Sequence, residues 1–110
     1  MHPRRGEVWW VSFDSSVGGE IQKTRPAIVL SNNAANAELN RVVVVPLTSP
    51  TERLYPGEAL VTINDDRSKA KADRIATASK QRLRNKIGTL SSADLGAVEK
   101  AVLLQLGIRR

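Results

Sequence analysis

The 110-residue sequence contains no cysteine and only one histidine. Without cysteine, the chain has no disulfide bond, thiolate metal site or cysteine nucleophile. His2 lies next to the N-terminus, where we interpret it as a solvated residue, so a histidine-based nuclease or triad is not expected. Acidic residues occur singly except for Asp65 and Asp66, which we interpret as turn residues. We therefore predict neither a metal site nor a cofactor.

The sequence also lacks a hydrophobic stretch long enough for a signal peptide or a membrane span. It has no Walker motif, no dinucleotide-binding glycine pattern and no zinc-ligand spacing. We expect a cytoplasmic protein that does not bind a membrane.

Positive charge is in excess, with 17 Lys and Arg against 11 Asp and Glu and a net charge of +6. Such a charge on a small chain favours a polyanionic partner such as RNA or DNA, although solubility alone is a competing explanation. The basic residues are scattered and form no basic amphipathic helix, which argues against a membrane surface. The length and the 41% hydrophobic fraction predict one globular domain over residues 1–110.

Short apolar or alternating runs predict about six strands, and a helical pattern appears only at the C-terminus. The expected strands span 8–13, 26–31, 41–48, 58–63, 72–79 and 84–90. Residues 32–40 allow one short helical turn, and residues 64–70 are expected to form a polar turn. Ser91 is the expected N-cap of a helix that ends before Gly107, with Asp94 completing a capping box. Leu95, Val98, Val102 and Leu106 recur at helical spacing on its apolar face.

This order of elements predicts a mainly β protein, built as a small antiparallel barrel with one C-terminal helix. No crossover helices separate the strands, so a parallel α/β fold is not expected. In the first strand, Trp9, Val11 and Phe13 share one face, and we expect Trp9 in the core. We interpret Trp10 as a residue packed at a dimer contact, with a stacking platform for RNA as the alternative.

With cysteine, histidine and metal sites excluded, arginine side chains and hydroxyl groups remain as candidates for catalysis at a phosphate. They suffice if the 2′-hydroxyl of RNA attacks the adjacent phosphate, because the substrate then carries the nucleophile. A planar guanidinium stabilises the negative charge of that transition state. In Lys23-Thr24-Arg25-Pro26, the proline favours an extended backbone at Arg25 and holds it at a strand entrance. From composition alone, a surface salt bridge would be the more common role for Arg25.

Several motifs in order resemble those of the MazF/PemK toxin family, and the similarity extends over nearly the whole chain. They are Arg5-Gly6-Glu7-Val8-Trp9, Gly18-x-Glu20, Lys23-Thr24-Arg25-Pro26-Ala-Ile-Val-Leu-Ser31, Val45-Pro46-Leu47-Thr48-Ser49, and Lys80-Gln81-Arg82-Leu83 followed by Ile87-Gly88. The resemblance implies an SH3-like barrel, a homodimer, and sequence-selective cleavage of single-stranded RNA that leaves a 2′,3′-cyclic phosphate and a 5′-hydroxyl. It also implies a toxin that is silenced by a cognate antitoxin, for which we expect a MazE-like protein with an acidic disordered tail.

The resemblance places Arg25 and Thr48 on the catalytic positions of the family. Gly18, Gly19 and Glu20 fall on the loop that gates its RNA groove, and Glu20 is a candidate general base by its chemistry. Lys23, Ser49, Asp73 and Arg74 are the further residues that we expect to contact RNA. The segment 74–80 lacks an arginine and an aspartate that many relatives have, so the base specificity cannot be carried over.

Two alternatives belong to other functional classes. A non-catalytic toxin on the same barrel, like CcdB, would bind DNA gyrase, because one fold can host either function. That mode depends on the end of the C-terminal helix, and residues 107–110 show no obvious counterpart. A plain RNA-binding barrel without catalysis would account for the net charge and for an exposed Trp10.

Overall fold

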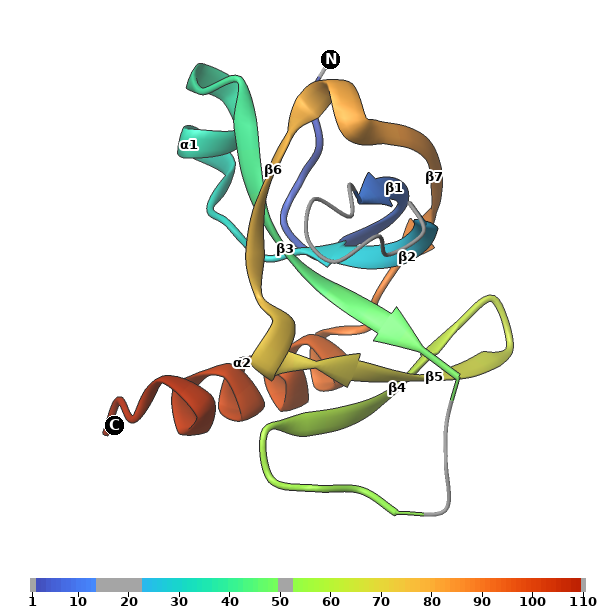
Figure 1. Cartoon of the computed structure of the whole chain (residues 1–110), viewed down its shortest axis with the longest axis vertical. Helices are drawn as coiled ribbons and strands as arrows, with labels where there is room; N and C mark the ends of the chain where they lie inside the picture. The colour runs from blue at the N-terminus through green and yellow to red at the C-terminus, as the bar shows by residue number, and fades with distance from the viewer. Residues whose placement is uncertain (1, 14–22, 50–52, 110) are drawn as a thin grey trace.

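The computed structural model describes residues 2–13, 23–49 and 53–109. In these residues the chain forms seven strands, two α-helices and two short 3₁₀ helices (Figure 1). The strands are β1 (Glu7–Phe13), β2 (Lys23–Val29), β3 (Arg41–Thr48), β4 (Glu58–Ile63), β5 (Asp66–Lys71), β6 (Ala76–Ser79) and β7 (Leu83–Thr89). The helices are α1 (Asn33–Glu38), η1 (Ala72–Arg74), η2 (Lys80–Arg82) and α2 (Ser92–Leu106).

All paired strands are antiparallel and follow the order β4-β5-β3-β2-β1-β7, with β6 also pairing with β3. The long strand β3 is shared by two parts of the sheet: its first half pairs with β6 and its end pairs with β5. The outer strand β7 pairs with β1, and this pairing brings Glu7 opposite Thr89. The result is the strongly curved, mainly β fold with one long C-terminal helix that the sequence predicted.

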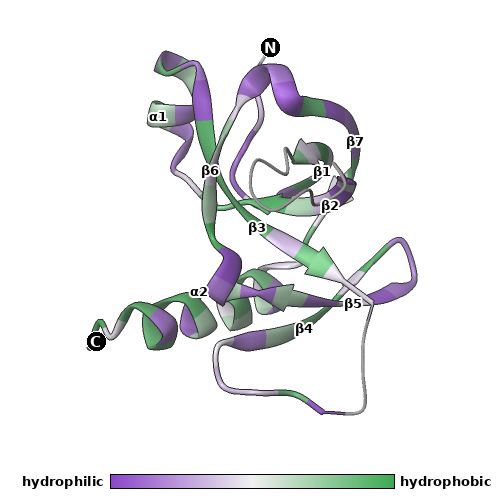
Figure 2. Cartoon of the chain, in the orientation of Figure 1, coloured by the Kyte–Doolittle hydropathy of each residue, from purple (hydrophilic) through white to green (hydrophobic). Residues whose placement is uncertain are grey.

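Two clusters of buried side chains form the interior. The helix-side core is formed by α2 and residues of the strands β1 to β5; its members include Val8, Ile28, Val45, Leu47, Val61, Ala70, Val98 and Val102. The sheet core consists of Val11, Ala27, Val29, Val42, Val44 and Ala78, with Trp9, Phe13 and Leu83 packed against it. The predicted face of Trp9, Val11 and Phe13 is confirmed, although Trp9 is only partly buried. Figure 2 shows hydrophobic residues along β1 and β3 and a mostly hydrophilic β5.

The predicted polar turn over residues 64–70 is wrong, because β5 begins at Asp66. The turn contains only Asn64 and Asp65, whose φ angles are 50° and 68°. Two consecutive positive φ values are typical of a type I′ hairpin, which asparagine and aspartate tolerate. The strand escaped detection because its sequence, DRSKAK, has almost no apolar alternation. The predicted strand 72–79 is likewise shorter, since η1 occupies its first three residues.

The predicted C-terminal helix is confirmed at both ends. The Ser91 side chain accepts a hydrogen bond from the Asp94 N–H, and Gly107 is the C-cap with φ 71°. The Asp94 carboxylate does not complete the capping box; its Oδ2 accepts instead from the Thr62 N–H of β4 at 2.9 Å. Leu106, expected on the buried face, is 53% exposed because the helix extends beyond the sheet. None of the described helices is long and apolar enough to cross a membrane.

Candidate active site

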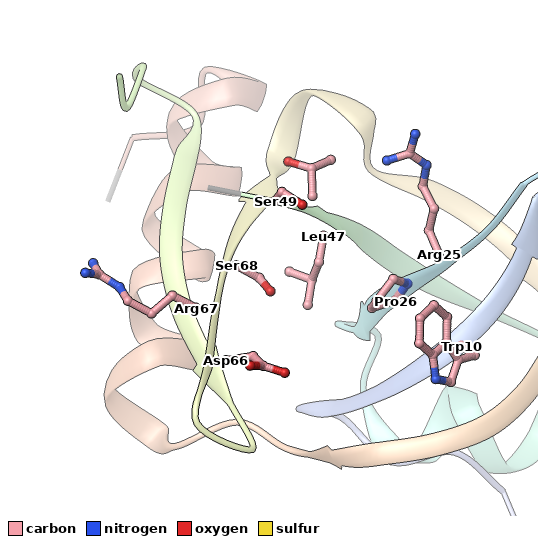
Figure 3. A pocket seen from close by; sticks show the side chains of 9 residues that line it. Trp10, Arg25, Pro26, Leu47, Ser49, Asp66, Arg67 and Ser68 are labelled. Atoms are coloured by element: carbon pink, nitrogen blue, oxygen red, sulfur yellow. The ribbon is translucent and has the colours of Figure 1, made fainter. Parts of the chain in front are cut away.

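A pocket of about 410 Å³ lies where four strands meet (Figure 3). Its lining residues are Trp10 of β1, Arg25 and Pro26 of β2, Leu47 and Thr48 of β3, Ser49, and Asp66, Arg67 and Ser68 of β5. One wall is therefore built from β1, β2 and β3, and the opposite wall from the β4–β5 hairpin. We call these the motif wall and the hairpin wall.

Arg25 is held on the motif wall by strand pairing. It lies opposite Val11 in the β1–β2 ladder, and the following Pro26 lies opposite Trp10. Pairing between β2 and β3 begins at Ala27, one residue after Pro26. Pro26 has no N–H to donate, and at this position no partner in β3 requires one. Within the described residues, the guanidinium of Arg25 has no hydrogen bond or ion pair. It is partly buried and available to bind an anion.

Thr48 is the last residue of β3 and Ser49 follows it, and both line the same pocket. Thr48 lies opposite Lys69 of β5, and the preceding Leu47 is 2% exposed in the helix-side core. The buried Leu47 anchors the backbone directly before Thr48, and pairing with β5 extends to Thr48 itself. The structure therefore brings Arg25, Thr48 and Ser49, which the sequence singled out, into one pocket.

The hairpin wall contributes the residues that the sequence analysis missed. Asp66 and Ser68 point into the pocket and Arg67 points away from it, as the alternation of a strand requires (Figure 3). Asp66 pairs through its backbone with Ile63, but its carboxylate makes no hydrogen bond or ion pair with any other residue that the structure describes. The signal that could have found it is Asn64-Asp65 as a two-residue turn, because such a turn makes Asp66 the first residue of a strand.

An ion-pair cluster around Glu58 supports the other face of the β4–β5 hairpin. Glu58 receives Lys71 Nζ at 2.7 Å and Lys69 Nζ at 3.2 Å, and its Oε1 accepts the Tyr55 N–H at 2.9 Å. Lys69, whose side chain is 5% exposed, also donates to the Arg53 carbonyl. The hydrogen bond from Lys71, with those from Tyr55 and Lys69, lowers the pKa of Glu58 to about 2. Glu58 thus satisfies a buried cation.

The N-terminal motif residues lie away from the pocket and hold the fold together. The Arg5 guanidinium binds Glu99 of α2 and the Leu30 carbonyl. Glu7 accepts hydrogen bonds from the Trp9 indole at 3.0 Å and from the Arg4 N–H at 2.8 Å, and pairs with Lys86 at 3.0 Å. Burial raises the pKa of Glu7, but these hydrogen bonds outweigh burial and lower it.

The other residues expected to contact RNA lie outside the lining of this pocket. Lys23 is exposed at the start of β2, opposite Phe13. Asp73 and Arg74 are exposed in η1, where Asp73 lies 4.0 Å from Lys71 Nζ. Their roles stay predictions. Gly18, Gly19 and Glu20 lie outside the described residues.

Acidic and histidine side chains do not gather into a metal-binding group of three within residues 2–13, 23–49 and 53–109. The pocket lining offers hydroxyls, the Asp66 carboxylate and two arginines, of which Arg67 points away. This donor set is suited to holding a phosphodiester through Arg25 and the hydroxyls of Thr48 and Ser49.

Comparison with known proteins identifies relatives over almost the full chain. "Endoribonuclease MazF9" of Mycobacterium tuberculosis is 36% identical over 114 aligned positions, covering 96% of this chain and 97% of the relative. "Endoribonuclease toxin MazF" of Escherichia coli is 29% identical, covering 96% and 95% of the two chains.

Solved structures have the same fold. An endoribonuclease in complex with its cognate antitoxin, from a mycobacterial species, superposes with a TM-score of 0.81 at 29% identity and covers 98% of both chains. MazF from Deinococcus radiodurans gives a TM-score of 0.83 at 24% identity, covering 98% and 99% of the chains. The family described as PemK-like, MazF-like toxin of type II toxin–antitoxin systems matches residues 4–106. The chain therefore belongs to the PemK-like, MazF-like toxin family.

Proposed function

We propose that this protein is a metal-independent, sequence-selective endoribonuclease that cleaves single-stranded RNA as the toxin of a toxin–antitoxin pair. The observation that carries the proposal is the presence of Arg25 and Thr48 in one open pocket, with the Arg25 guanidinium unpaired among the described residues. The full-length relatives named endoribonucleases support the same activity. The family favours it over gyrase binding and over RNA binding without catalysis.

In the proposed reaction the 2′-oxygen forms a bond to the adjacent phosphorus while the bond from phosphorus to the 5′-oxygen breaks. The products are a 2′,3′-cyclic phosphate and a 5′-hydroxyl. The Arg25 guanidinium stabilises the additional negative charge on the phosphate oxygens in the transition state. It acts as an electrostatic group, because the planar guanidinium carries a delocalised positive charge that faces the phosphate oxygens in pairs.

Thr48 donates a hydrogen bond from its hydroxyl to a phosphate oxygen. Ser49 binds the adjacent part of the RNA backbone. Lys23, Asp73 and Arg74 extend the RNA contacts beyond the pocket, with Gly18, Gly19 and Glu20 as the expected gating loop. Glu20 remains our candidate for the base that removes the 2′-hydroxyl proton, and the 5′-oxygen takes up a proton as it leaves.

We further propose that residues 1–110 act as one domain, in a cytoplasmic homodimer that a cognate antitoxin silences. One structural relative was solved with its cognate antitoxin. The net charge of +6 attracts an acidic, disordered segment, which can cover a wide surface as it folds on binding. Deletion of the acidic tail from the antitoxin should abolish inhibition.

The test is cleavage of end-labelled single-stranded RNA of mixed sequence in excess EDTA, with the cut positions and end groups mapped. We expect cuts that leave cyclic phosphate ends. A matched RNA with a single 2′-deoxy nucleotide at the mapped cut site should stay intact at that site, because it lacks the nucleophile. Intact RNA across many sequences, or cleavage at the deoxy site, would contradict the proposal.

A further inference from the structure

We propose that Trp10 and Asp66 form a base-binding slot within the pocket, and that this slot selects guanine beside the cleaved bond. The inference rests on the proposed ribonuclease function and adds the residues that choose its substrate. Trp10 comes from the motif wall and Asp66 from the hairpin wall, so the base would lie between the two walls (Figure 3).

Trp10 provides the apolar surface of the slot. It is 41% exposed although it lies in the middle of β1, between the buried Val8 and Val11. Its partner across the ladder, Pro26, is a second flat apolar group in the same pocket lining. Unpaired RNA bases stack on exposed aromatic rings of this kind, whatever their sequence. Trp10 therefore accounts for binding of a base, but not for the choice of one.

Asp66 provides the choice. A carboxylate repels the RNA backbone and accepts hydrogen bonds, so Asp66 fits a ligand group that donates them. Base edges carry such donors. Guanine presents the adjacent N1–H and N2–H donors, which match the two oxygens of one carboxylate. Cytosine and adenine present an amino donor next to a ring nitrogen acceptor, which a carboxylate repels, and uracil presents a single N–H between two carbonyl groups.

Ser68 adds a matching donor. It lies two residues after Asp66 on the same face of β5 and also points into the pocket (Figure 3). Its hydroxyl can donate to guanine O6, which neighbours N1–H on the same edge of the base. Ser68 and Asp66 together therefore match a base edge with an acceptor followed by two donors. Among the four bases, only guanine has this edge, formed by O6, N1–H and N2–H.

The hairpin wall is braced as selectivity requires. The Asn64 side-chain amide donates to the Ile87 carbonyl of β7 at 2.9 Å, and the Asp94 carboxylate accepts from the Thr62 N–H. Gly88 allows this approach, because a Cβ there would lie 2.9 Å from the Ile63 Cδ1 atom. These two hydrogen bonds attach the end of β4 and the turn to α2 and β7, and so support the position of Asp66 at the start of β5.

The primary experiment compares the cut sites of the wild type, Asp66→Asn and the matched control Asp65→Asn on a random single-stranded RNA pool. Asp65 is the neighbouring carboxylate, lies outside the pocket lining, and has the left-handed backbone that asparagine adopts readily. We expect wild type and Asp65→Asn to cut beside guanosine, and Asp66→Asn to lose about 10- to 100-fold of that preference.

Replacement of that guanosine by inosine, which lacks the N2 donor, should slow the wild type about tenfold and Asp66→Asn far less. A cut pattern that is independent of guanosine, or identical in all three proteins, would overturn the slot.

A binding measurement separates failure of the slot from failure of the ribonuclease. A 2′-deoxy oligonucleotide with a single guanine should quench the tryptophan fluorescence of the wild type and bind more tightly than its inosine counterpart. Trp10→Phe, which retains Trp9, identifies the signal from Trp10. Selective guanine binding without RNA cleavage would contradict the proposed function and support the slot. If Asp66→Asn weakens antitoxin inhibition and leaves guanine selectivity intact, Asp66 contacts the antitoxin and the slot is wrong.

Discussion

The two walls of the pocket differ in how they are held and in how visible they are in the sequence. Arg25 and Thr48 lie on β2 and β3. These strands also carry Ile28 and Val45, which are fully buried. Asp66 lies on a polar strand supported by ion pairs and side-chain hydrogen bonds. The motif wall thus combines chemistry with the core, whereas Asp66, Arg67 and Ser68 of the hairpin wall belong to neither core cluster and can change with little effect on packing. We infer that the first wall cleaves and the second selects.

The sharpest test of this division is removal of Arg25. Arg25→Ala should lower the single-turnover rate at saturating RNA about 10²- to 10³-fold, because a charged group that stabilises the transition state is lost. Arg25→Lys should recover only part of the rate, since an ammonium lacks the planar fork of the guanidinium. Arg84→Ala, which removes an exposed arginine of β7 outside the pocket, is the matched control. Equal rates for Arg25→Ala and the control would contradict the assignment.

The hairpin wall should respond to acid through Glu58. Its pKa of about 2 lies below the ordinary value of 4.5, so its ion pairs stabilise the fold fully above that ordinary value. As the pH falls from about 4.5 to about 2, the carboxylate takes up a proton and this stabilisation is lost. The Tm of Glu58→Gln should therefore lie below that of the wild type at neutral pH, and the gap should close towards pH 2.

Thermal unfolding followed by circular dichroism between pH 2 and 7 measures that gap. Glu38→Gln is the control, because Glu38 is exposed in α1 and has no ion pair among the described residues. A gap between Glu58→Gln and wild type that stays constant over this pH range would show that the ion pairs are not its source.

A smaller effect on the rate is expected from Thr48. Thr48→Val keeps the shape of the side chain and removes the hydroxyl, so the cleavage rate should fall about tenfold, as for the loss of one hydrogen bond. Thr48→Ser retains the hydroxyl and should cleave at close to the wild-type rate. The same end-labelled RNA assay measures both rates. A wild-type rate in Thr48→Val would contradict a catalytic role for the Thr48 hydroxyl.

The smallest effect is expected away from both walls. Ser91→Ala removes the N-cap of α2 and should lower the free energy of unfolding by about 1 kcal/mol. Urea denaturation measures the loss, while the cleavage rate and the cut sites should stay as in the wild type. A change in the cut sites would show that the helix cap influences the hairpin wall.

Sequence patterns predicted the regions with strong apolar periodicity. β1, β3, β4 and α2 lie within a residue or so of their predicted ranges, because buried faces impose their spacing on the sequence. The pattern failed at β5, whose buried Lys69 is stabilised by Glu58 rather than by apolar contacts. Ionic burial leaves no periodic signal, so β5 was not predicted and Asp66 was interpreted as a turn residue. Trp10 was noticed, but its place in the pocket depends on Pro26 across the ladder.

The pairing of β1 with β7 has a consequence for the order of folding. Strand β1 carries Trp10, and one of its two neighbouring strands is β7, which ends at Thr89. The ion pair of Arg5 likewise has its partner, Glu99, near the other end of the chain. Contacts between such distant parts of a chain form late and slowly. During synthesis, residues near the N-terminus therefore stay incompletely paired until the C-terminal segment has left the ribosome. A ribosome making this protein therefore completes nearly the whole chain before β1 has both of its neighbouring strands.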